Sequence, residues 1–70
     1  MTRIVYATYE SDDYSVTFSG VIYGKGEVEH VLIESATILG VEHSPVEMKR
    51  DLREALLDKV SELSGSEWSE

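Results

Sequence analysis

The sequence predicts an α+β domain, in which an antiparallel meander of three to four β-strands carries one C-terminal amphipathic helix packed on one face, giving two layers. Two observations predict this fold. Residues 1–43 alternate strand-like runs with glycine-containing or polar turns, whereas only residues 44–63 show a long helical pattern. Short connections favour antiparallel neighbours, and a helix that follows them buries its apolar stripe on the sheet.

The strand-like runs are rich in β-branched and aromatic residues, which favour an extended backbone. They cover residues 4–9, residues 14–23 with an interruption at Gly20, and residues 28–39. At the start of the second run, Tyr14, Val16 and Phe18 alternate with small polar residues. This alternation is typical of an antiparallel strand with one buried face.

The connections between these runs have the composition of turns. Residues 10–13 are polar and contain two aspartates, whose side chains can hydrogen-bond to their own backbone. Gly24-Lys25-Gly26 supplies the positive φ angles that a hairpin needs. The third run is expected to bend near Glu34-Ser35 and to end at Gly40, before a short link to the helix.

The predicted core combines one face of the sheet with the apolar stripe of the helix. Its expected members are Ile4, Tyr6, Val16, Phe18, Val21, Tyr23, Leu32, Ile38, Leu52, Leu56 and Val60. The pattern leaves open which parity of residues 4–9 faces inward. One sheet face stays uncovered in this arrangement. If that face carries Val5, Ile22, Val31 and Ile33, its apolar area favours a sheet-to-sheet dimer.

The helix is expected to run from Ser44 to Leu63. Ser44 can cap its N-terminus, Pro45 suits the first helical position, and Glu47 completes a capping box with Ser44. Gly65 can adopt the left-handed conformation that closes a helix. At the helical period the residues expected to face the sheet are Met48, Leu52, Ala55, Leu56, Val60 and Leu63.

The opposite face of this helix carries a row of carboxylates. Its members, spaced by three or four residues, are Glu47, Asp51, Glu54, Asp58 and Glu62. Like charges at this spacing each cost a few tenths of a kcal/mol in an isolated helix, and Arg50 and Arg53 offset part of that. One interpretation is a solvated face that keeps the protein soluble. The other is a surface that binds a basic partner, because four helical residues rise ~6 Å, comparable with the spacing of successive phosphates.

Size and charge restrict the class of protein. Seventy residues without a cysteine form one domain, expected at residues 1–65 with a flexible tail at 66–70, and exclude disulfides and cysteine-based zinc sites. A net charge of −8, from 14 acidic and 6 basic residues, argues against direct binding to nucleic acid or an anionic membrane. It permits a basic protein partner. With neither a signal-like segment nor an apolar run of membrane-spanning length, the expected location is cytoplasmic.

No pattern of catalytic, cofactor-binding or metal-binding residues is present, so we expect a non-enzymatic protein without a cofactor. His30 lies in a strand of alternating charge, and His43 precedes the helix. Gly24-Lys25-Gly26 lacks the spacing and the Lys-Ser/Thr ending of a phosphate loop. The acidic residues of the first turn lack the alternate spacing and central glycine of a calcium loop.

Residues 28–63 resemble small uncharacterised proteins encoded by tailed phages and prophages. The resemblance rests on a strand that ends in Leu39-Gly40-Val41-Glu42 and on the capped terminal helix that follows. It implies a small α+β fold and a phage accessory role inside the host cell, in which many such proteins bind and disable a host protein.

Two hypotheses for function follow. The first is an acidic protein-binding module, a phage-encoded inhibitor that binds a basic host protein through the carboxylate row. In its most specific form, this hypothesis makes the protein a nucleic-acid mimic. The second is a structural or assembly homodimer whose acidity serves only solubility. Both keep the carboxylate-lined helix exposed, and they differ in whether a basic partner exists.

Overall fold

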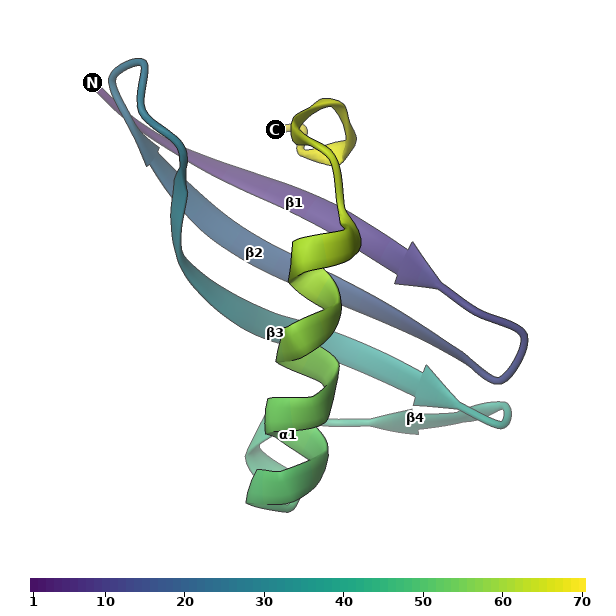
Figure 1. The fold of residues 1–70 in the computed structure, drawn as a ribbon. Helices are drawn as coiled ribbons and strands as arrows, with labels where there is room; N and C mark the ends of the chain where they lie inside the picture. The colour runs from purple at the N-terminus through teal and green to yellow at the C-terminus, as the bar shows by residue number, and fades with distance from the viewer.

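A computed structural model describes all 70 residues. Four strands form one antiparallel sheet in the order β1-β2-β3-β4, and α1 lies across one of its faces (Figure 1). The strands and the α-helix are β1 (Thr2–Glu10), β2 (Tyr14–Tyr23), β3 (Val28–Ile38), β4 (Val41–His43) and α1 (Arg50–Leu57). Three short 3-10 helices are η1 (Pro45–Glu47), η2 (Asp58–Glu62) and η3 (Gly65–Glu67). The predicted meander with one C-terminal helix on one face is confirmed.

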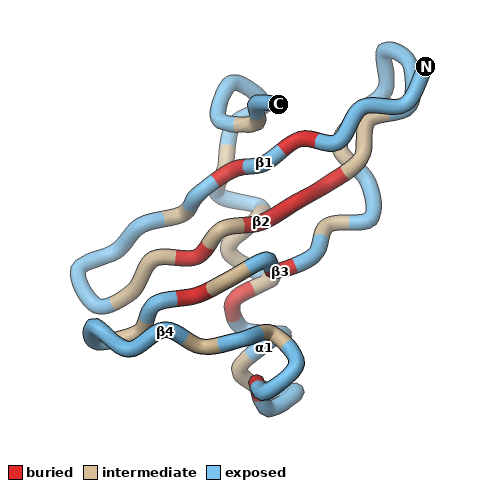
Figure 2. The backbone as a smooth tube through the Cα atoms, turned by 180° about the vertical axis from the view of Figure 1, so that it is seen from behind, coloured by how far each residue is buried: buried red, intermediate tan, exposed pale blue.

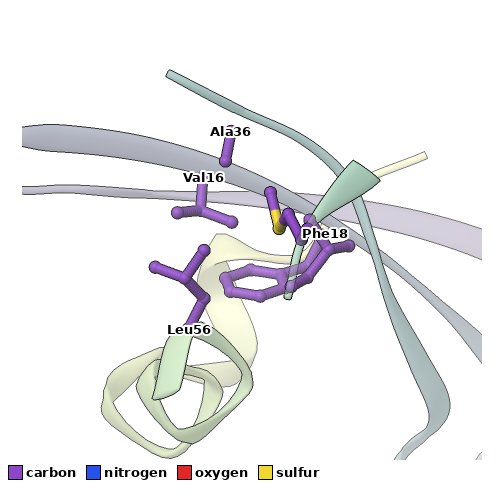
Figure 3. Close-up of a cluster of buried hydrophobic side chains, with 6 residues drawn as sticks. Val16, Phe18, Ala36 and Leu56 are labelled. Carbon is purple, nitrogen blue, oxygen red and sulfur yellow. The ribbon is translucent and has the colours of Figure 1, made fainter. Parts of the chain in front are cut away.

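The core lies between α1 and the face of the sheet that it covers. Val16 and Phe18 of β2 are fully buried there, beneath Leu56 of α1 (Figure 3). The cluster consists of Val16, Phe18, Ile33, Ala36, Met48 and Leu56. Because Ala7 is paired with Phe18, the odd-numbered residues of β1 share this covered face.

The prediction of the core is right for Val16, Phe18 and Leu56, and four other predicted members are half-buried: Val21, Ile38, Leu52 and Val60. It is wrong for four residues that are exposed: Ile4 (58%), Tyr6 (45%), Tyr23 (48%) and Leu32 (64%). In β1, it is Val5 and Ala7 that turn inward.

The error at Leu32 follows from two irregularities in β3. The register between β2 and β3 shifts between Thr17 and Phe18 and again between Ser19 and Val21. Each shift inserts one extra residue in β3, which moves the following side chains to the other face. Ile33 is therefore paired with Phe18 on the covered face. The first shift leaves Glu34 as the extra residue, at the place where a bend was expected.

The uncovered face of the sheet has no element over it (Figure 2). Its apolar residues are Ile4 and Tyr6 of β1, Val21 of β2 and Leu32 of β3, joined by the pairs Ile4–Val21, Tyr6–Ser19 and Ser19–Leu32. The four residues that the sequence suggested for this face all lie on the covered face instead. Val5 and Ile33 are buried, and Ile22 and Val31 are half-buried on the helix side.

The helix does not start at Ser44, and the expected capping box with Glu47 does not form. η1 ends at Glu47, and both Met48 (φ −72°, ψ 138°) and Lys49 (φ −66°, ψ 149°) are extended before α1 begins. Met48 is drawn into the core, with 7% of its surface exposed. Arg53 donates hydrogen bonds to the carbonyl oxygens of Pro45 at 3.0 Å and Met48 at 3.4 Å, which holds this break together.

The end of the helix also differs from the prediction. η2 ends at Glu62, the backbone of Leu63 after it is extended, and Gly65 does not adopt a left-handed conformation. Gly65 instead begins η3. There the carboxylate of Glu67 accepts a hydrogen bond of 2.9 Å from the backbone N–H of Ser64.

In the segment 66–70, expected to be a flexible tail, Ser69 and Glu70 contact the outer edge of β1. The backbone N–H of Tyr6 donates to the carbonyl of Ser69 at 2.7 Å, and the N–H of Ser69 donates to the carbonyl of Tyr6 at 2.9 Å. Arg3 forms an ion pair with Glu70 at 3.3 Å. Trp68 is half-buried against the core cluster.

Candidate acidic binding surface

The five carboxylates expected to form one row lie on three consecutive elements. Glu47 belongs to η1, Asp51 and Glu54 belong to α1, and Asp58 and Glu62 belong to η2. All five side chains are exposed. The extended backbone at Met48 and Lys49 separates Glu47 from the others, so the row does not start at Glu47.

Three of these carboxylates share one side of the helix. With 3.6 residues per α-helical turn, Asp51, Glu54 and Asp58 fall within a sector of about 60°, opposite Leu56. Glu62 is four residues further along a 3-10 helix, whose three residues per turn rotate it by about 120° from Asp58. The continuous surface is therefore Asp51, Glu54 and Asp58, which we call the acidic patch. It spans about two turns, or ~10 Å, rather than four turns.

Two members of the acidic patch have no cationic partner. The ion pairs of the helical region are Arg50 Nε with Glu54 at 3.2 Å and Lys59 Nζ with Glu62 at 3.7 Å. Arg50, which was expected to offset part of the repulsion between the carboxylates, pairs only with Glu54. The Arg50–Glu54 pair is highly exposed and contributes little stability. Asp51 and Asp58 therefore present free carboxylates to solvent.

Lys59 lies on the side of the helix that faces the tyrosines of β1 and β2. Tyr9 and Tyr14 are stacked with ring centroids 5.9 Å apart. The neighbouring Tyr14, Glu62 and Tyr9 raise the pKa of Lys59, while partial burial and Glu62 raise the pKa of Tyr9. The ammonium group of Lys59 forms its ion pair with Glu62 and not with Asp51 or Asp58.

The other candidate residues are dispersed over the fold. The ring of His30 meets Tyr23 edge-on at 6.0 Å, whereas His43 is half-buried in β4 opposite Ala36. Gly24-Lys25-Gly26 lies in the β2–β3 turn, with Gly24 at φ 59°. Three His, Cys, Asp or Glu side chains nowhere gather as a metal ion would require. None of the helices has the length and apolar character needed to span a membrane.

A groove that no sequence pattern predicted lies between the last turn of the helix, the tail and the sheet. It has a volume of about 680 Å³ and is lined by apolar side chains that include Val5, Ile22, Val31 and Leu63. Trp68 forms part of its wall, and Arg3, Glu27 and Glu70 contribute its charged groups. The tail forms one wall of this groove. The groove could therefore not be predicted without knowing where the tail lies. The one sequence signal was Trp68, a large apolar residue in a segment expected to be solvated.

No protein-family model, curated protein or solved structure matches this chain.

Proposed function

We propose that the protein is a non-enzymatic acidic module that binds a basic protein through the acidic patch on α1. The observation that carries the proposal is the pair of exposed, unpartnered carboxylates of Asp51 and Asp58, on the side of the helix opposite buried Leu56. A partner's cations would meet these groups without first displacing another cation. Only Glu54 would have to break its ion pair with Arg50 before it could bind a cation of the partner.

Net charge supports the same proposal. A total of −8 attracts a basic surface over a distance of roughly one Debye length, about 8 Å at physiological salt. The acidic patch then provides local complementarity, since charge arrangement contributes mainly specificity and association rate. As a nucleic-acid mimic it offers three carboxylates on two turns, which suits a small basic cleft rather than a long groove. Given the resemblance of residues 28–63 to phage and prophage proteins, we propose that the chain is a phage-encoded inhibitor and that its basic partner is a host protein.

Charge reversal tests the acidic patch. The triple variant Asp51→Lys, Glu54→Lys and Asp58→Lys is expected to lose at least tenfold in capture of basic proteins from a bacterial lysate at low salt, because attraction becomes repulsion. The matched control is Glu10→Lys, Asp12→Lys and Asp13→Lys, at the exposed end of β1 and in the β1–β2 turn, which changes the net charge equally. Circular dichroism of both variants checks that the fold is kept.

The control is expected to retain most of the captured protein, and capture by the unaltered chain is expected to weaken steeply with salt. Equal losses in the two variants would show that net charge alone is responsible. Undiminished capture by the patch variant would contradict the proposal.

The uncovered sheet face favours a second candidate function, a homodimer with a structural role. Ile4, Tyr6 and Leu32 form an apolar cluster on it and are 45–64% exposed. Apolar residues gathered on one face mark an interaction site more often than scattered ones do. If two copies bury this face against each other, Leu32→Lys is expected to halve the mass measured by light scattering. An unaltered chain that is already monomeric would exclude this candidate.

A further inference from the structure

The outer edge of β1 is the long free edge of the sheet. β1 has nine residues, whereas β4 at the opposite edge has three. The carbonyl of Met1 accepts a hydrogen bond from Gly24, so odd-numbered residues of β1 direct their backbone groups toward β2. Tyr6 bonds outward to Ser69. The alternation of an antiparallel ladder then places the N–H and C=O groups of Ile4 and Thr8 outward as well.

The composition of β1 makes this edge prone to pairing. Residues 4–9 read Ile-Val-Tyr-Ala-Thr-Tyr and carry no charge, in a chain with a net charge of −8. Segments of about six residues with high β-propensity, low charge and no proline pair readily with other strands. Proteins usually protect such edges with charges, proline, bulges or a covering segment. β1 contains no proline, and its pairing with β2 is regular throughout.

The covering segment here is the tail. Ser69 occupies the outward position at Tyr6, near the middle of β1, through two backbone hydrogen bonds. The Arg3–Glu70 ion pair adds a contact between half-exposed side chains, which is worth little by itself. Trp68, half-buried against the core cluster, anchors the chain just before Ser69, so that Ser69 and Glu70 are the residues that contact the edge itself. The tail therefore blocks a central position of the edge through contacts that a few substitutions can remove.

We propose that this tail guards a self-association surface, and that its release lets β1 pair with β1 of a second copy. Antiparallel pairing about a two-fold axis at Tyr6 places Ile4 opposite Thr8 of the second copy and Thr2 opposite Glu10. No like charges face each other along the ladder, and β-branched and aromatic side chains form the cross-strand contacts. The result is one continuous sheet across both copies. This surface is separate from the acidic patch on α1.

A full-length variant with Ser69→Pro and Glu70→Gln tests the guard. Proline removes the N–H that donates to Tyr6, and glutamine removes the ion pair with Arg3, while Trp68 is kept. The mass measured by light scattering is expected to double relative to the unaltered chain. The increase is expected to be larger at high salt, because screening weakens the repulsion between two acidic copies. This dependence is opposite to that expected for binding at the acidic patch.

Adding Thr8→Pro supplies the decisive control. The N–H of Thr8 faces away from β2, so proline there removes no hydrogen bond of the sheet and only the exposed contact of 3.4 Å between the Thr8 and Thr17 hydroxyls. It blocks pairing at the edge and is expected to restore the original mass. Leu32→Lys, on the uncovered face, is expected to leave the doubled mass unchanged.

A chain that ends at Trp68 makes the same test without a proline in the tail, with circular dichroism and Trp68 fluorescence as checks on folding. A mass that stays constant in both tail variants overturns the proposal. So does a rise in mass that Thr8→Pro fails to reverse.

Discussion

Replacing Phe18 with alanine is expected to remove roughly half of the protein's free energy of unfolding. Phe18 is fully buried on β2, in the cluster that also contains Leu56 of the helix (Figure 3). A buried Phe→Ala change costs about 3–5 kcal/mol, through lost burial and the cavity that remains. A domain of this size has a total stability of roughly 4–10 kcal/mol. Urea unfolding followed by circular dichroism measures the loss.

Leu32→Ala is the matched control for this prediction. Leu32 was expected in the core with Phe18, but 64% of its surface is exposed. Its truncation is therefore expected to change the free energy of unfolding by no more than about 0.5 kcal/mol, as for ordinary surface sites. Similar losses at the two positions would mean that Leu32 is buried, in the monomer or in a dimer. Light scattering on the same sample separates those cases.

The strands and their order could be predicted from sequence, because alternation and turn residues are local signals. The face of the sheet on which each side chain lies could not be predicted for every residue. In β3 the apolar run Val31-Leu32-Ile33 fits either face, and the two register shifts decide which residues turn inward. Nothing in the residue types of β3 marks both shifts. The parity of β1 likewise depends on its pairing with β2, which is a long-range property.

The helix shows how one local pattern can have two outcomes. Ser44 to Glu47 and Ser64 to Glu67 both read Ser-x-x-Glu. Only the second forms the hydrogen bond between the backbone N–H of the serine and the carboxylate of the glutamate. At the first, burial of Met48 and the hydrogen bonds of Arg53 favour an extended break instead. These are tertiary contacts, which sequence periodicity does not contain.

The same cause limits what could be predicted about the candidate site. The sequence identified the residues of the acidic patch and their side of the helix. It could not give the extent of the surface, because the break at Met48 and the change to 3-10 winding after Leu57 both interrupt the helical period. The outcome is a patch of three carboxylates in place of a row of five. The edge of β1 and its tail were missed because Trp68 was the only local sign of packing.

The second large effect is expected at Leu56. It is the one buried residue of α1, and its truncation to alanine is expected to cost about 2–5 kcal/mol in the free energy of unfolding. Ala55→Ser is the control, since Ala55 was assigned to the same apolar stripe but is exposed, and an effect within about 0.5 kcal/mol is expected. Urea unfolding of both variants provides the comparison. Equal losses would mean that Ala55 is as buried as Leu56, with the helix rotated about its own axis.

Combining the milder truncations Leu56→Val and Phe18→Leu, which leave enough stability to measure, tests whether helix and sheet form one packed unit. Because the two side chains belong to one cluster, their costs are expected to be non-additive by about 0.5–3 kcal/mol. Additive losses would indicate that α1 rests on the sheet without a shared core. In that case the helix could move independently, and the acidic patch on its outer side would lose the fixed geometry from which binding to a basic partner was argued.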